Sequence, residues 1–194
     1  MFLFQASPAP KVILFFGDSL SAGYGLSPEE AFPALVEKEL NNTGLTVKVV
    51  NAGSSGETTA GGVSRVDWLL RQPIDVFVLE LGGNDMLRGL PVAQTRANLQ
   101  KIIDKVKAKY PHIKIVLAGM LAPPNMGKQY TDDFRNIFPD LAKKNNATLI
   151  PFLLKDVGGI EKLNQADGIH PNVEGHKIVA RNLTPVLLKV LQTP

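Results

Sequence analysis

The chain has 194 residues, of which 44% are hydrophobic and 20% are charged, which is the composition of an ordinary globular domain. The net charge is +3, with Lys and Arg scattered among Asp and Glu, so nucleic acid is not an expected partner. The absence of cysteine excludes disulfides, thiolate metal sites and a cysteine nucleophile. No apolar stretch approaches the roughly 18 residues that span a bilayer, so we expect no stable membrane insertion.

The first ten residues differ from the rest of the chain. Met1 to Phe4 form a short apolar run without the positive flank of a signal peptide, and Gln5 to Pro10 resemble the region after a signal cleavage site. We expect residues 1–10 to be a disordered or signal-remnant segment. Residues 11–194 contain no linker, repeat or change in composition, so we expect them to form a single domain.

Lys11 to Gly17 form an apolar run that is too short for a helix and ends abruptly at glycine. This pattern predicts a buried strand that leads into a tight turn carrying Ser19. Ser27 and Pro28 are typical of a helix start and predict a helix that ends near Asn41. The β-branched run over 46–50 predicts the second strand, which leads into a glycine-containing polar turn over 51–57.

The same alternation continues to the end of the chain. Apolar residues at helical spacing predict helices over 58–70, 91–109, 130–145 and 173–191, with a kink or break at Pro139. Apolar runs predict strands over 74–81, 113–118 and 148–152. Five strands alternating with helices predict an α/β fold, a three-layer α/β/α sandwich with a five-stranded parallel sheet.

In such a fold, every loop from a strand to the following helix lies at the same edge of the sheet. The loops that carry Ser19, Gly56 and Asn84, the loop over 119–127 and the loop over 167–170 are therefore expected to converge on one crevice.

Ser19 is the candidate nucleophile, and a serine hydroxyl needs a base and a third group that orients the base. His112 lies at the opposite edge of the predicted sheet, and His176 falls inside the last helix, where we expect a half-buried or solvated side chain. His170 lies in a loop at the correct edge, three residues after Asp167. In a tight turn Asp167 can reach Nδ1 of His170, which leaves Nε2 free to face the serine.

Two other interpretations of these residues stay open. Asp167 and His170 also fit a turn with a side-chain hydrogen bond to the backbone. A metal site is the other possibility, with Asp167, His170 and His176 as ligands. It lacks a further strong ligand at a recognisable spacing, so we expect no metal.

An acyl-transfer site also needs hydrogen-bond donors for the oxyanion that forms in the transition state. Gly56 can supply a backbone N–H and Asn84 a carboxamide N–H, each after a different strand. Either residue alone is ordinary turn chemistry, but their combination with the other three candidates favours a hydrolase. We interpret Asp18 and Asp85, beside the candidate residues, as turn residues that bind the backbone.

Four segments carry a resemblance to a known family: GDSLSAGYG from Gly17, NAGSSGE from Asn51, ELGGNDMLRG from Glu80 and DGIHPN from Asp167. They resemble the four sequence blocks of the GDSL or SGNH serine hydrolases, in the same order and at similar spacing. The likeness is greatest to small bacterial members that act on thioesters, lysophospholipids and aryl esters.

This resemblance implies a flavodoxin-like strand order, that is the SGNH hydrolase fold, and a periplasmic or secreted location. It implies that Ser19 is the nucleophile and the first oxyanion donor through its own N–H, with Gly56 and Asn84 as the other donors. Asp167 and His170 complete the implied triad, and no cofactor is expected.

Apolar residues lie beside the candidate site in segments where a solvated loop would be polar. They predict a groove for an acyl chain, closed by the loop over 119–127; the alternative is that they only pack against one another and the neighbouring helices. The candidate substrate-binding residues are Met86, Leu87, Leu121, Pro123, Met126 and Ile169.

The sequence thus predicts a serine ester hydrolase, most simply a monomer, that acts on small-molecule acyl esters and thioesters. An alternative with the same triad is a carbohydrate acetyl esterase or an acyltransferase. A third hypothesis is a flavodoxin-like binding module for a phosphate or flavin, which Leu20, Ala22 and Tyr24 in the first loop disfavour.

Overall fold

The computed structural model describes residues 9–193, so the expected signal remnant lies outside the described residues except for Ala9 and Pro10. Five parallel strands form one sheet in the order β2-β1-β3-β4-β5, the flavodoxin-like order that the resemblance implied. The strands are β1 (Lys11–Gly17), β2 (Val47–Gly53), β3 (Val76–Glu80), β4 (Lys114–Ala118) and β5 (Thr148–Ile150).

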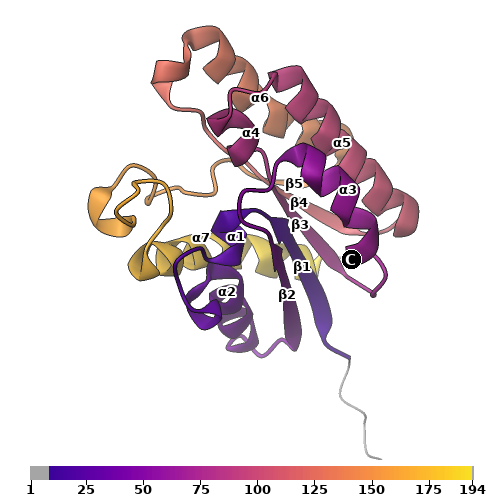
Figure 1. The fold of residues 1–194 in the computed structure, drawn as a ribbon. Helices are drawn as coiled ribbons and strands as arrows, with labels where there is room; N and C mark the ends of the chain where they lie inside the picture. Colours follow the sequence, from indigo (N-terminus) through magenta and orange to yellow (C-terminus); the bar gives the residue numbers. More distant parts are fainter. Residues whose placement is uncertain (1–8, 194) are drawn as a thin grey trace, which may run out of the picture.

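Helices cover both faces of the sheet, which confirms the three-layer sandwich (Figure 1). Helices α2 (Phe32–Asn41) and α7 (Val173–Gln192) pack together on one face, and α3 (Thr59–Leu69), α5 (Val92–Lys109) and α6 (Lys128–Asn145) lie on the other. The connection from β1 to β2 runs in the opposite direction across the sheet from the later ones. Because such crossovers are right-handed, α2 must lie on the opposite face from α3, α5 and α6.

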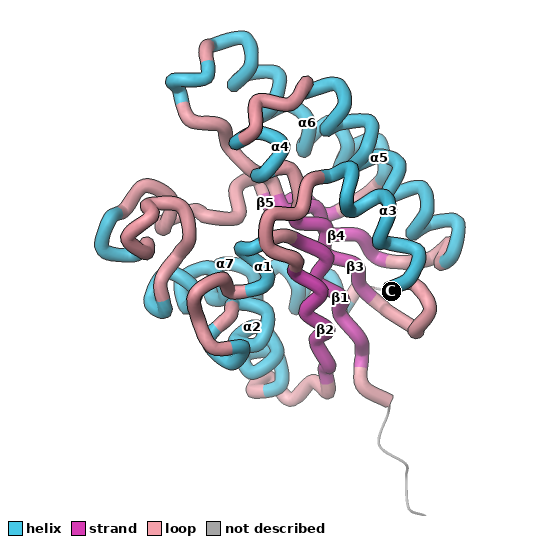
Figure 2. The backbone as a smooth tube through the Cα atoms, in the orientation of Figure 1, coloured by secondary structure: helices cyan, strands magenta, loops and turns pink. Residues whose placement is uncertain are grey.

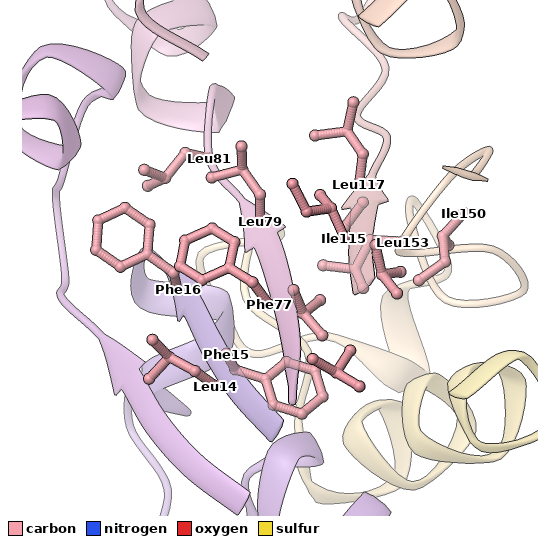
Figure 3. Packing of buried hydrophobic residues seen from close by; sticks show 14 of the residues in the cluster. Leu14, Phe15, Phe16, Phe77, Leu79, Leu81, Ile115, Leu117, Ile150 and Leu153 are labelled. Atoms are coloured by element: carbon pink, nitrogen blue, oxygen red, sulfur yellow. The ribbon is translucent and has the colours of Figure 1, made fainter. Parts of the chain in front are cut away.

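The central strands β1 and β3 are apolar along nearly their whole length because both faces of the sheet are buried. Phe15, Phe16, Phe77 and Leu79 are almost completely excluded from solvent and belong to one buried core that also includes residues of β4 and β5 (Figure 3). This core fixes the ends of β1 and β3, where the chain turns toward the candidate site.

Two short helices follow these strands, where the sequence predicts turns. Helix α1 (Ser19–Ala22) begins directly after β1, and α4 (Gly83–Leu87) begins after β3. Figure 2 shows both at the same edge of the sheet. Helices of four and five residues are too short to display a hydrophobic period, so the sequence did not reveal them.

Several predicted boundaries were wrong. The helix expected over 27–41 is divided into the 3₁₀ turn η1 (Pro28–Glu30) and α2, because Ala31 is extended. Strand β2 continues to Gly53, where it still pairs with Gly17 of β1, and β5 ends at Ile150. The next residue, Pro151, has no N–H to offer the sheet.

Pro139 does not break α6, which continues from Lys128 to Asn145. The proline lies on the exposed side of the helix, so water can replace the hydrogen bond that its ring nitrogen cannot donate. Among the helices of the described part of the chain, none is both long and apolar enough to cross a membrane.

Candidate active site

Ser19 lies at the carboxyl end of β1 and is the first residue of α1. Gly17 immediately before the turn must be glycine, because a Cβ there would lie 2.3 Å from both Glu80 Oε2 and Ser21 Oγ. The Asp18 side chain caps α1, with Oδ1 accepting a hydrogen bond from the Leu20 N–H at 3.0 Å. The turn thus holds the Ser19 side chain, which is 9% exposed, at the edge of the sheet.

The structure brings His170 and Asp167 to Ser19. His170 Nδ1 lies 2.7 Å from Asp167 Oδ2, and Nε2 lies 2.9 Å from Ser19 Oγ. An ionised carboxylate can only accept hydrogen bonds, so Nδ1 carries the ring proton and donates a hydrogen bond to Asp167. Nε2 is then the bare nitrogen of the ring and accepts a hydrogen bond from the serine hydroxyl.

The loop that carries this pair is closed on itself. An antiparallel bridge joins Asn164 to Pro171, and the Gln165 N–H donates to the His170 carbonyl at 2.7 Å. Gly168, with φ +69°, permits the tight turn between them. Gln165 Nε2 also donates to the Tyr24 carbonyl at 2.7 Å, and this bond ties the loop to the segment after α1.

Asp167 is held ionised by the same turn. Its Oδ1 accepts hydrogen bonds from the backbone N–H groups of His170 and Ile169, at 3.0 and 2.9 Å. These bonds and the one from the imidazole lower the pKa of Asp167 to about 2, the backbone N–H of His170 being the largest cause. The carboxylate therefore stays an acceptor for His170 throughout the neutral range.

The candidate oxyanion donors are the backbone N–H groups of Ser19 and Gly56 and the side-chain amide of Asn84. Within residues 9–193, the backbone N–H groups of Ser19 and Gly56 donate to no other group. Gly56 has φ +78°, and its carbonyl accepts a hydrogen bond from Arg88 Nη2 at 2.8 Å. Asn84, on α4, donates from Nδ2 to Asp18 Oδ2 at 3.0 Å, and its second amide hydrogen has no acceptor within residues 9–193.

Glu80, the last residue of β3, is fully buried beneath the serine turn. Its Oε2 accepts hydrogen bonds from the Asp18 N–H at 3.1 Å and from Ser21 Oγ at 2.7 Å, while Oε1 has no partner in the described part of the chain. Burial, reinforced by the nearby Asp18, raises the pKa of Glu80 well above its ordinary range. Glu80 thus supports the serine turn from below. The sequence signal was a charged residue at the end of an otherwise apolar strand, and our interpretation of the sequence missed it.

The other two histidines lie away from Ser19. His112 is exposed in the turn before β4, at the opposite edge of the sheet. The expectation of a half-buried or solvated His176 was wrong, because this side chain is 1% exposed and its Nδ1 accepts the Phe32 N–H at 3.0 Å. In residues 9–193, no group of three His, Asp or Glu side chains is arranged to hold a metal ion.

The apolar candidates divide into two groups. Leu87, at the end of α4, and Leu121 and Ile169, on two different loops, are 54%, 42% and 45% exposed at the edge of the sheet that carries Ser19. Pro123 is also exposed and Met126 is half-buried against the core. Met86 is buried in the core, so packing accounts for it.

Asp85 agrees with its interpretation as a turn residue that binds the backbone. Its Oδ2 accepts the Thr59 N–H at 2.8 Å, and Oδ1 accepts the Thr59 hydroxyl. The residue therefore joins α4 to the start of α3.

A comparison with protein families matches residues 15–178 to the GDSL-like lipase/acylhydrolase family. The chain belongs to this family. The hydrolase is 38% identical over 190 residues to esterase TesA of Pseudomonas aeruginosa, covering 97% of this chain and 94% of that protein. It is 39% identical over 178 residues to thioesterase 1/protease 1/lysophospholipase L1 of Escherichia coli K12, covering 91% and 83% of the two chains.

Solved structures lead to the same family. The hydrolase superposes on AlinE4, a SGNH-hydrolase family esterase, with a TM-score of 0.80 and 41% identity, over 97% of this chain and all of that one. The predicted family and the SGNH hydrolase fold are therefore confirmed. The protein is a carboxylic ester hydrolase.

Proposed function

We propose that the hydrolase cleaves acyl esters and thioesters through a covalent acyl-enzyme on Ser19. The observation that carries this proposal is the continuous hydrogen-bonded chain from Ser19 Oγ through His170 to Asp167. The activities named for the Pseudomonas and Escherichia relatives support both substrate classes.

In the acylation step, Ser19 Oγ attacks the carbonyl carbon of the substrate while its proton passes to His170 Nε2. The carbonyl double bond opens to an oxyanion, and the imidazolium is stabilised by the ionised Asp167. The tetrahedral intermediate then collapses and expels the alcohol or thiol, which takes the proton from Nε2. Water repeats these steps on the acyl-enzyme, releases the carboxylic acid and restores the Ser19 hydroxyl.

The oxyanion is stabilised by the N–H groups of Ser19 and Gly56 and by the Asn84 amide. Neutral donors that are already oriented before the reaction stabilise developing charge without reorganisation, and removal of one costs about 10² to 10³ in kcat. The two backbone donors, which have no partner within residues 9–193, support this assignment.

The apolar part of the substrate is expected to bind along Leu87, Leu121, Pro123, Met126 and Ile169. Four of these five apolar residues are exposed, and each methylene that they cover contributes at most about 0.8 kcal/mol. Specificity should therefore rise with acyl length and then level off at the length that these side chains can cover.

Labelling with a fluorophosphonate tests the nucleophile. A single adduct should form on Ser19, and Ser19→Ala should lose ester turnover by several orders of magnitude while it still folds. Ser21→Ala is the matched control, because Ser21 is a buried serine of the same short helix whose hydroxyl donates to Glu80 instead. An adduct on any other serine would refute the assignment.

The preference among substrate classes is tested by measuring turnover of p-nitrophenyl esters of rising acyl length, a palmitoyl thioester and a lysophospholipid. Turnover confined to acetylated sugars would favour the alternative of a carbohydrate acetyl esterase with the same triad.

A periplasmic or secreted location and a monomeric state stay predictions, to be checked by cell fractionation and by sedimentation.

A further inference from the structure

Asp18 lies between two of the proposed oxyanion donors. Its Oδ1 accepts the Leu20 N–H at 3.0 Å and caps α1, and its Oδ2 accepts Asn84 Nδ2 at 3.0 Å. The residue is 2% exposed, so water does not compete for these bonds. One carboxylate therefore joins the serine turn after β1 to α4 after β3.

The nitrogen and the oxygen of an asparagine amide have nearly the same size, so packing alone cannot determine which of them faces the substrate. An ionised carboxylate accepts hydrogen bonds and donates none, so it binds the NH₂ end of Asn84 and repels the oxygen. We propose that Asp18 is a positioning residue that orients the Asn84 amide, so that an N–H is directed at the oxyanion. This inference rests on the oxyanion role proposed for Asn84.

The groups that face Asp18 are consistent with an ionised carboxylate. Burial is the largest influence on the pKa of Asp18 and raises it to about 6. The hydrogen bonds from Leu20 and Asn84 and the charge of His170 lower this pKa, but by less than burial raises it. Glu80 and Glu57 also lie near; Glu80 holds its proton more tightly than an ordinary glutamate, and Glu57 is paired with Arg65. Above about pH 7, the negative charge therefore resides on Asp18.

Asp18→Asn tests this role with little change in shape. The introduced amide can still cap α1 through its Oδ1, but it presents an NH₂ group to Asn84. The Asn84 amide then turns so that its oxygen accepts a hydrogen bond from that NH₂ group, and the N–H is withdrawn from the oxyanion. We expect kcat for a p-nitrophenyl ester at pH 8 to fall about 10²-fold, most of the loss for one oxyanion donor, with KM changed by less than about 2-fold.

A double-mutant cycle shows whether the effect passes through Asn84. If it does, Asp18→Asn should lower kcat by less than about 3-fold in the Asn84→Ala background. Normal kcat in Asp18→Asn, or a full 10²-fold further loss in the double variant, would overturn the inference. Normal kcat in Asn84→Ala would overturn the oxyanion assignment itself, so the two failures are distinguishable.

Two further variants separate positioning from folding. Asp18→Ser keeps an oxygen that can cap α1 but cannot reach Asn84, and it should show the same loss of kcat with a melting temperature close to that of the wild type. Asp75→Asn is the matched control, because Asp75 accepts the Val12 N–H at 2.8 Å near the opposite end of β1. An Asp18→Ser enzyme with normal kcat would also contradict the proposed role.

Discussion

His176 offers a test in which stability and catalysis separate. Its ring is buried against Phe32, with centroids 5.8 Å apart, and Nδ1 accepts the Phe32 N–H. Burial is the main cause that lowers the pKa of His176 from 6.5 to about 4. Between pH 6.5 and pH 4, His176 is protonated in the unfolded chain but stays neutral in the folded protein. The free energy of unfolding should therefore decrease as pH falls from 6.5 toward 4. At about 1.4 kcal/mol per unit of pKa, the full effect is about 3 kcal/mol.

His176→Asn removes this titration, because the asparagine Oδ1 can accept the same N–H and does not ionise. Urea unfolding followed by far-UV circular dichroism at about pH 7.5 and pH 4 should show that the wild type loses about 3 kcal/mol more than the variant. The raised pKa values of Asp18 and Glu80 act in the opposite direction, but they act in both proteins and cancel in the difference.

The same variant tests the choice of the catalytic base. His176→Asn should keep its turnover at pH 8, whereas His170→Ala should lose activity about as severely as Ser19→Ala. Parallel stability curves would refute the account of the buried imidazole. An inactive His176→Asn enzyme beside an active His170→Ala enzyme would refute the assigned base.

Three further predictions concern the triad, the groove and the buried acid. Asp167→Asn should lower kcat by about 10⁴, because the amide can donate to Nδ1 and leave the proton on Nε2; steady-state assays showing less than a 10-fold loss would contradict this. Leu121→Ser should flatten the rise of kcat/KM with acyl length on p-nitrophenyl esters and leave acetate esters nearly unchanged, and equal losses on all esters would instead mean that the loop supports the triad. Glu80→Gln should become more stable relative to the wild type as pH rises above the ordinary titration range of a glutamate, because a buried acid with a raised pKa loses stabilising energy as pH increases; identical pH dependences of the urea midpoint would refute this.

The sequence predicted the fold because the signals for this fold are local. Apolar runs such as 11–17 and 74–81 are too short for helices, and their alternation with amphipathic segments leaves few arrangements besides a parallel sheet. The boundaries failed where they depend on partners, as at Gly53, which continues β2 because Gly17 lies beside it.

The candidate site was predictable to the extent that topology places it. Ser19, Asn84 and His170 could be brought together because they follow strands that end at one edge. The partners that hold them could not be predicted, because Glu80, Gln165 and Arg88 bind segments far away in sequence. For Glu80 the sequence signalled only an unusual charged residue at the end of an apolar strand, not what it binds. The burial of His176 was missed for the same reason, since its partner Phe32 is 144 residues away.

The proposed nucleophile and base are separated by 151 residues, on the first and the last of the loops at this edge. The ribosome must therefore deliver nearly the whole chain before the two can meet. Domains fold as units during synthesis, so we expect a nascent chain to react with no fluorophosphonate until the 165–171 loop has emerged. Covalent labelling of stalled chains of increasing length would thus show at what point in synthesis the nucleophile and the base come together, long after the central strands have been made.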